Sequence, residues 1–279
     1  MKARASKPRG VSSNLDGRYS DPQGSKTRLG ACCTLALSAF LAALPAAAQD
    51  KKKPDKKPDP QVIVAVPLGA AAGKTTRIAL RGFGLDKATQ VKLTGGTAKI
   101  VRQGAAPVPD KNPQRIGDTQ VVLDVTLDEK PAASTISLVV VTPDGELKPH
   151  KLLVETALPV IADKEPNDGF KQAQPITLPV VIEGMIDRPK DVDVFRFAGK
   201  KGQKFSAEVL AHRYGSPLDA MLTLYSADGN QVAFNDDLGP DTRDARLEVV
   251  LPVDGEYYLV LVDALDTGGP AHAYRLVVK

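Results

Sequence analysis

Apolar and polar residues alternate over short runs along most of the chain from residue 62 onward. The runs are rich in Val, Ile, Leu and Thr, and Gly, Pro, Asn or Asp separates one run from the next. Alternation with a period of two places the apolar side chains on one face of a strand, and no window sustains the longer period of a helix. The pattern therefore predicts an all-β protein built from short strands joined by turns.

The first group of predicted strands falls within residues 61–158, and the proline-rich stretch 104–117 is predicted to be a surface loop. The predicted strands are 62–66, 76–80, 89–93, 119–125, 135–141 and 151–154. Short strands at regular spacing with turn residues between them are typical of a β-sandwich. We therefore expect residues 61–158 to form one such domain.

A second group of strands follows in residues 159–279, with a hairpin turn expected at Asp228-Gly229-Asn230. The predicted strands are 195–197, 205–209, 222–225, 231–234, 247–251, 257–262 and 274–278. Each half is long enough to enclose its own core. The expected architecture is therefore two β-sandwich domains in tandem.

The N-terminal 49 residues have the pattern of a secretory signal peptide. A basic stretch is followed by the apolar run Ala31–Leu44 and then by small residues. The apolar run is shorter than a membrane span needs, which argues against the alternative of an uncleaved anchor. We expect a secreted or periplasmic protein with no transmembrane span after processing. Cys32 and Cys33 both lie in this segment, so the mature chain is predicted to be free of cysteine.

Residues 50–60 form a Lys-, Pro- and Asp-rich stretch that is predicted to be an extended, solvated linker. A basic tail that binds the cell wall or membrane is the alternative, which the interspersed aspartates weaken. The chain carries a formal net charge of +4, but residues 161–279 alone carry −6. A nucleic-acid binder would keep a basic surface after processing, so we expect no nucleic-acid partner.

No catalytic constellation is evident. The chain has three histidines, and none lies in a known catalytic motif. Tryptophan is absent and aromatic residues make up only 5%, which gives sugar stacking little support. We therefore predict no catalytic residue.

Two short acidic runs concentrate the candidate chemistry of the chain. Carboxylate and amide oxygens suit a hard cation such as Ca²⁺, and residues two apart in an extended chain share a face. The same residue types also form turns, so spacing alone leaves both interpretations open. The candidate ligands are Asp163, Glu165, Asn167, Asp168, Asp191 and Asp193.

Residues 163–279 resemble the bacterial pre-peptidase C-terminal domain. The resemblance is carried by Glu165-Pro166-Asn167-Asp168, by Asp191-Val192-Asp193-Val194-Phe195 and by Gly255-Glu256-Tyr257-Tyr258-Leu259-Val260. It implies a jelly-roll-like β-sandwich. The segment is also similar to the collagen-binding domains of clostridial collagenases, in which an N-terminal acidic segment binds calcium. By that analogy the six candidate ligands would hold a structural Ca²⁺.

Residues 62–156 resemble, more loosely, an immunoglobulin-like domain of the IPT/TIG type. The shared residues are Leu80-Arg81-Gly82-Phe83-Gly84-Leu85 and Val141-Thr142-Pro143-Asp144-Gly145. The resemblance implies that the first sandwich is immunoglobulin-like and precedes the jelly-roll-like one.

Together these observations predict an exported, non-catalytic binding or accessory protein of the envelope or extracellular space. Its calcium-stabilised second domain would mediate contacts with protein or polysaccharide, and we expect a monomer. A secreted, peptidase-associated hydrolase is the first alternative. A purely structural envelope protein is the second.

Overall fold

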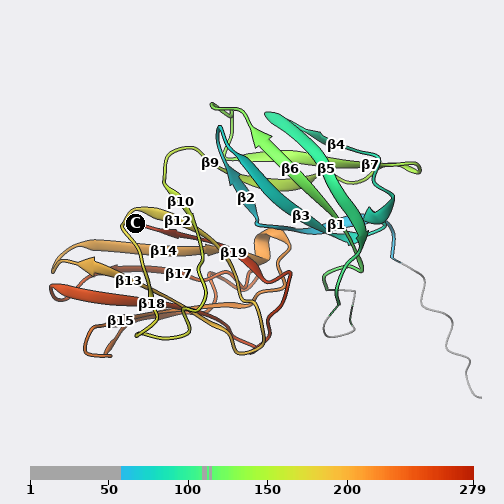
Figure 1. Ribbon diagram of the computed structural model, residues 1–279. Coiled ribbons are helices and arrows are strands. Elements are labelled where there is room, and N and C mark those ends of the chain that lie inside the picture. Colours follow the sequence, from blue (N-terminus) through green and yellow to red (C-terminus); the bar gives the residue numbers. More distant parts are fainter. Residues whose placement is uncertain (1–57, 109–111, 113–114) are drawn as a thin grey trace, which may run out of the picture. The chain divides into compact units, whose positions relative to one another are not determined.

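The computed structural model describes residues 58–108, 112 and 115–279 (Figure 1). All of them belong to one compact unit, residues 54–279. The predicted signal peptide, both cysteines and most of the predicted linker lie outside the described residues. The all-β prediction is confirmed, because the helices of the described part are two short 3₁₀ helices, η1 (Leu85–Lys87) and η2 (His212–Tyr214).

The first half of the described chain forms two facing sheets. One sheet has the strand order β1 (Gln61–Val66), β3 (Thr75–Phe83), β6 (Thr119–Leu127) and β5 (Gly96–Ala105). The other has the order β2 (Gly69–Ala71), β9 (His150–Glu155), β7 (Thr135–Thr142) and β4 (Gln90–Leu93), with β8 (Gly145–Glu146) paired to β7. Their inward side chains form one buried apolar cluster, as expected for a sandwich.

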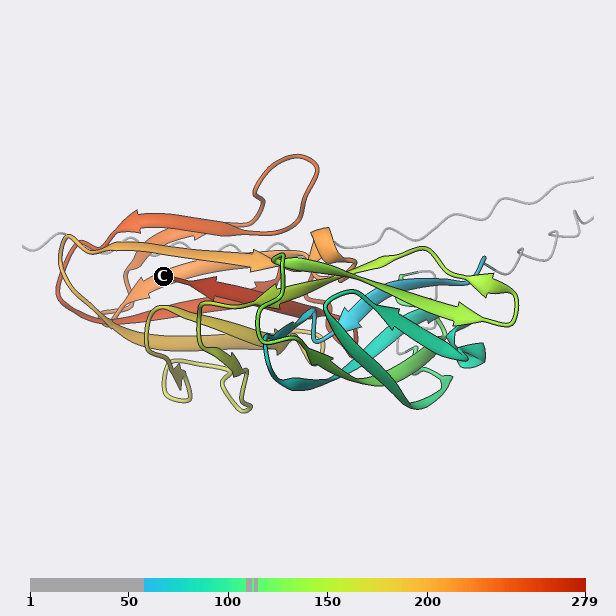
Figure 2. The same cartoon turned by 90° about the horizontal axis from the view of Figure 1, so that it is seen from above.

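The second half forms two more sheets of five strands each (Figure 2). One has the order β10 (Val160–Ala162), β12 (Val180–Met185), β19 (Ala273–Val278), β14 (Lys204–Leu210) and β17 (Arg246–Val250). The other has the order β11 (Gln174–Pro175), β13 (Val192–Gly199), β18 (Gly255–Asp263), β15 (Ala220–Ser226) and β16 (Gln231–Asn235). A second apolar cluster fills the space between them.

Every strand predicted from alternation is present, and so is the hairpin turn, where Ser226 N–H donates to Asn230 O at 2.9 Å. Strand β12 was missed because its first three residues, 180–182, are apolar on both faces. Val181 points away from the sandwich core and is nevertheless fully buried, so the alternation disappears. Strand β5 was missed because a bulge between Ile100 and Arg102 breaks its period, and the predicted loop begins only after Ala105.

A third apolar cluster joins the two halves within the compact unit. It combines Val64, Leu68 and Leu153 with Ala271 and Ala273 of the second half. Leu68 is followed by Gly69, where a Cβ atom would overlap the guanidinium group of Arg275. Glycine at this position therefore permits the close approach of the two segments.

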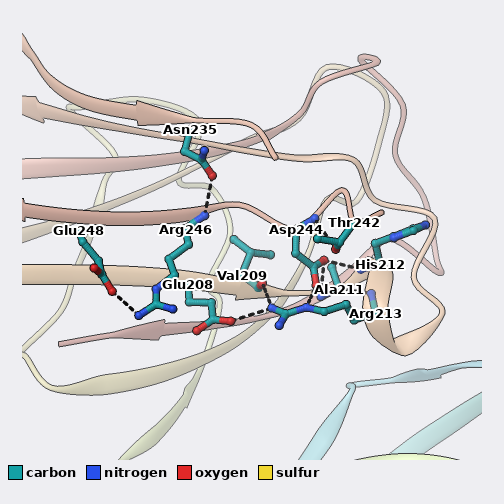
Figure 3. Close-up of polar contacts among 10 residues, drawn as sticks. All are labelled: Glu208, Val209, Ala211, His212, Arg213, Asn235, Thr242, Asp244, Arg246 and Glu248. Atoms are coloured by element: carbon teal, nitrogen blue, oxygen red, sulfur yellow. Dashed lines mark hydrogen bonds and ion pairs between the residues drawn. The ribbon is translucent and has the colours of Figure 1, made fainter. Parts of the chain in front are cut away.

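One buried carboxylate binds the backbone of the residues that directly follow β14. Asp244 is fully buried, and one of its oxygens accepts the N–H groups of Ala211 and His212 at 3.0 and 2.6 Å (Figure 3). Its other oxygen accepts Arg213 Nε at 2.5 Å. The side chain thus satisfies the amides that begin η2, and the arrangement is structural.

We expect Asp244→Asn to lower the free energy of unfolding by about 1–3 kcal/mol, because one acceptor oxygen is lost from a buried network. Urea denaturation followed by far-ultraviolet circular dichroism measures the change. Asp236→Asn is the matched control, since it removes the same charge from an exposed side chain. Equal denaturation midpoints for the two variants would contradict the structural role.

Candidate cation site

The acidic residues singled out in the sequence lie on two neighbouring segments. Residues 163–168 begin the connection from β10 to β11, and Asp163 is fixed there by its N–H bond to Glu183 O at 2.9 Å. Asp191 immediately precedes β13 and Asp193 is its second residue. The N–H of Val194 donates to Asn167 O at 3.1 Å, which brings the two segments together.

Three carboxylates converge. Asp163, Glu165 and Asp193 each offer one oxygen, and these oxygens lie within 4.8 Å of one another. They differ in burial, with Asp193 fully buried, Asp163 half-buried and Glu165 exposed. The cluster therefore extends from the interior of the sandwich to its surface.

Asp193 is held from within the core. Tyr274 of β19 donates its hydroxyl hydrogen to Asp193 Oδ2 at 2.6 Å. The tyrosine ring crosses strand β12 at Gly184, where any Cβ atom would overlap it. The second oxygen of Asp193, Oδ1, is buried and has no hydrogen-bond partner among the described residues. A buried carboxylate oxygen without a donor is costly, and a cation would satisfy it.

Asn167 is also buried and lies against the cluster. Its side-chain amide donates to Asp163 Oδ1 at 2.6 Å, and its backbone N–H donates to Glu165 Oε2 at 3.2 Å. Its own Oδ1 is buried and finds no donor in the described part of the chain. The Asn167 side chain therefore presents one further oxygen with unmet bonding capacity.

Asp168 and Asp191 are not part of the group of three. Arg188 lies between them and forms ion pairs with Asp168 Oδ1 at 2.5 Å and with Asp191 Oδ1 at 3.0 Å. Asp191 Oδ2 accepts the N–H of Asp187 at 2.7 Å. In this arrangement the two carboxylates organise the turn before β13 and are already paired with a cationic side chain.

Burial, and after it the convergence of negative charge, raises the pKa values of the cluster. Burial, together with the neighbouring Glu165, raises the pKa of Asp163 to about 7. Burial and the nearby Asp163 raise the pKa of Asp193 to about 9, against the hydrogen bond from Tyr274, which lowers it. The pKa of Glu165 is also raised, chiefly by desolvation. Without a counter-ion the cluster is therefore poised to retain protons near neutral pH.

A pocket of about 320 Å³ opens beside the cluster and gives access from solvent. Its acidic wall is made by Asp163, Glu165, Glu183 and Asp187. Val66, which precedes Pro67 in the first half of the chain, also lines the pocket. The lining of this pocket thus includes two of the three converging carboxylates, Asp163 and Glu165.

Sequence reasoning missed the residues that complete this site. Tyr274 lies 81 residues after Asp193, and Arg188 had no signal that distinguished it from a surface arginine. For this part of β19 the sequence predicted only a strand at residues 274–278. The donor to Asp193 could be identified only after the pairing of β12 with β19 was known.

His212 and Ser216 lie close together in the sequence, and each bonds to another partner. Ser216 Oγ donates to Ala271 O at 3.3 Å, and Arg243 N–H donates to His212 Nδ1 at 3.5 Å. His150 is mostly buried, which lowers its pKa to about 4.

Residues 191–262 match the family model of the bacterial pre-peptidase C-terminal domain. The resemblance expected from the sequence is therefore confirmed for this part of the chain. The matched segment starts at Asp191 and includes Asp193, but it leaves out residues 163–168.

A stretch of 98 residues is 39% identical to a probable subtilase-type serine protease of Deinococcus radiodurans. It covers 34% of this chain and 13% of the protease, so the chain corresponds to a small part of that relative.

Among the described residues no helix is both long and apolar enough to cross a membrane.

Two solved structures show a limited likeness. The pre-peptidase C-terminal domain of a Bacillus anthracis collagenase is 20% identical, with 38% of this chain and 94% of that chain covered at a TM-score of 0.32. The periplasmic lysozyme inhibitor PliG of Aeromonas hydrophila is 14% identical, with 44% and 100% covered at a TM-score of 0.30.

Proposed function

We propose that this chain is an exported, non-catalytic accessory protein whose second sandwich is a Ca²⁺-stabilised binding module that accompanies secreted peptidases. The match of residues 191–262 and the partial similarity to a probable subtilase-type protease support an association with peptidases. The module would contact protein or polysaccharide outside the cytoplasm.

The observation that carries the calcium proposal is the convergence of Asp163, Glu165 and Asp193 around the unpartnered Oδ1 of Asp193. Ca²⁺ prefers carboxylate and amide oxygens and accepts irregular geometry, whereas Mg²⁺ demands near-octahedral coordination. Asn167 Oδ1 is the next candidate ligand, because it is buried and unpartnered among the described residues.

Asp168 and Asp191 have a different role in this proposal. Both are paired with Arg188, so they would orient the turn that carries the ligands. Release of Arg188 toward solvent would be needed before either carboxylate could bind the ion directly. Arg188→Gln is therefore expected to strengthen Ca²⁺ binding, since it removes a competing positive charge near the site.

Isothermal titration calorimetry of the mature protein with CaCl₂ and with MgCl₂ tests the proposal. We expect one Ca²⁺ site, much weaker Mg²⁺ binding, and loss of the Ca²⁺ site in Asp193→Asn but not in Asp236→Asn. A panel of peptidase and glycosidase substrates is assayed on the same protein. Absence of Ca²⁺ binding would refute the metal proposal, and substrate turnover would refute the non-catalytic one.

A further inference from the structure

A pocket of about 250 Å³ lies beside the loop that joins β18 to β19, residues 264–272. Arg115 and Ile116, which precede β6 in the first half of the chain, also line it. None of the six candidate cation ligands belongs to its lining, so the pocket is separate from the candidate cation site. Its volume is below the roughly 300–1,000 Å³ typical of pockets for drug-sized ligands, so it suits a small molecule.

The loop that forms one side of this pocket is fixed by a buried carboxylate at its start. Asp263 Oδ1 accepts the N–H groups of Leu265 and Thr267 at 3.0 and 2.9 Å, and the Thr267 hydroxyl at 2.9 Å. Asp263 Oδ2 accepts the N–H of Asp219 at 2.9 Å. The loop is therefore ordered before any ligand binds, which lowers the entropy cost of binding.

The residues from the first half are held by a buried arginine. Arg81 is 2% exposed, and its Nε donates to Ile116 O at 3.5 Å while its Nη2 donates to Pro107 O. Ile116 is itself buried and belongs to the third apolar cluster together with Ala271. The pocket is thus bordered on both sides by residues with fixed positions.

The apolar part of the lining is aliphatic. It consists of Ile116 and three prolines, Pro189, Pro217 and Pro270. Neither Phe nor Tyr is among the described residues that line the pocket. Proline rings lose almost no conformational freedom when a ligand packs against them. This surface suits a short aliphatic group.

Two polar side chains of the lining are bonded to each other. The Thr267 hydroxyl gives its hydrogen to Asp263 Oδ1, so His272 Nε2 is the donor in its 3.1 Å contact with Thr267 Oγ1. Thr267 and His272 therefore stabilise the loop. The charged groups that remain for a ligand are Arg115 and Asp266.

Arg115 and Asp266 are both anchored at the pocket. Arg115 Nη2 donates to Pro217 O at 3.3 Å, which ties the guanidinium group to another lining residue. The backbone N–H of Asp266 donates to Asp263 O at 3.0 Å, and its carbonyl oxygen accepts the N–H of Lys190 at 3.3 Å. Within the part of the chain that the structure describes, neither side chain forms an ion pair. Each charge is therefore available to a group of opposite sign.

The two charges together restrict the kind of ligand. A purely apolar molecule would desolvate both charges without compensating either, which is costly. An anion would compensate Arg115 and be repelled by Asp266, and a cation would have the reverse problem. A small molecule that carries both a carboxylate and an ammonium group satisfies both side chains.

We propose that this pocket binds a free α-amino acid with an aliphatic side chain. Its carboxylate lies toward Arg115, its ammonium group toward Asp266, and its side chain packs against the prolines. Peptide hydrolysis is the class of reaction that releases such molecules. The inference goes beyond the proposed function, because neither the structural ion nor the contacts with a partner require a small-molecule ligand.

Isothermal titration calorimetry of the full mature protein, with Ca²⁺ present, tests the inference with three probes of similar size. L-leucine carries both charges, isocaproate lacks the ammonium group and isoamylamine lacks the carboxylate. We expect leucine to bind. Each probe with a single charge should bind about tenfold more weakly or worse, because it loses a hydrogen bond between charged groups.

Two variants assign the charges of the ligand to their partners. Asp266→Asn should weaken leucine binding by about tenfold and leave isocaproate binding unchanged, since isocaproate has no ammonium group. Asparagine tolerates the left-handed backbone of this position, where φ is 55°. Arg115→Gln should weaken leucine and isocaproate but not isoamylamine. A loss of structure would instead weaken all three probes.

The matched controls are Asp236→Asn and Arg102→Gln, because both side chains are exposed and lie outside the pocket. Both should bind leucine like the parent protein. The inference is overturned by absence of leucine binding, by equal affinity for isocaproate, by unchanged leucine binding in both pocket variants, or by tighter binding of the dipeptide leucyl-leucine. A Ca²⁺ titration of the same protein tests the calcium-stabilised module separately, since the two sites share no residue.

Discussion

Millimolar Ca²⁺ is expected to raise the melting temperature of the mature protein, and to raise it more at pH 8 than at pH 5. A ligand that binds only the native state at 100 times its Kd stabilises it by about 2.7 kcal/mol. For a protein of this size that corresponds to roughly 5–10 °C. Binding requires deprotonated carboxylates, so the shift should grow as the pH rises.

In chelator the opposite pH dependence is expected, and the sign follows from the two raised pKa values. In the folded, metal-free protein the pKa of Asp163 is about 7 and that of Asp193 is about 9, whereas an unfolded aspartate has a pKa of about 3.9. The folded state therefore binds more protons than the unfolded state between these values. This contribution to stability is complete below pH 4 and is lost as the pH rises through 7 and 9.

Differential scanning calorimetry at several pH values, with Ca²⁺ and with chelator, measures both trends. Asp193→Asn should abolish the Ca²⁺ shift in melting temperature, because the carboxylate ligand is lost. It should also flatten the pH dependence of stability in chelator, because the amide does not titrate. The amide oxygen still accepts the hydrogen bond from Tyr274. Asp236→Asn should behave like the parent protein. Identical melting curves with Ca²⁺ and with chelator at pH 8 would contradict the prediction.

Arg275→Met is expected to lower the free energy of unfolding by about 3–5 kcal/mol, the usual effect of leaving one member of a buried ion pair alone. Arg275 is almost fully buried, and its Nε donates to Glu183 Oε1 at 2.5 Å. Burial raises the pKa of Glu183, while the charge of Arg275 opposes that shift. Without the arginine, Glu183 would be a desolvated carboxylate without a cationic partner beside the candidate cation site.

Two comparisons separate this effect from a simple loss of packing. Arg275→Met combined with Glu183→Leu should recover much of the lost stability, since an apolar pair can replace a buried ion pair. Arg77→Met removes an exposed partner of Asp124, and solvent screening should make its effect small. Urea denaturation of the parent protein and the three variants measures these free energies of unfolding. Equal losses of stability for Arg275→Met and Arg77→Met would contradict the effect assigned to burial.

The strands were predictable because alternation is a local property. Runs such as residues 257–262 place every second side chain in the core whichever partner strand they have. Strands β12 and β5 were not predicted from the sequence, because their apolar and polar residues do not alternate regularly. Val181 is buried on the outward face, and Val101 occupies the bulge of an edge strand.

The acidic segments were also recognisable from local composition, because hard-cation ligands and turn formers are the same few residue types. Composition could not separate the ligands from their neighbours. Asp168 and Asp193 look equivalent in the chain, yet one is paired with Arg188 and the other has a buried oxygen without a donor among the described residues. Strand register and the position of Arg188 make that difference.

Local pattern was thus enough for the all-β class, the positions of most strands and the two acidic runs, because each depends on residues close together in the chain. The tertiary structure decided which carboxylates converge and which residue donates a hydrogen bond to them. Each of these depends on contacts between distant residues, such as Asp193 with Tyr274 and Phe170 with Tyr258. Such contacts are set by strand pairing, and the alternation of a single strand carries no information about its partner.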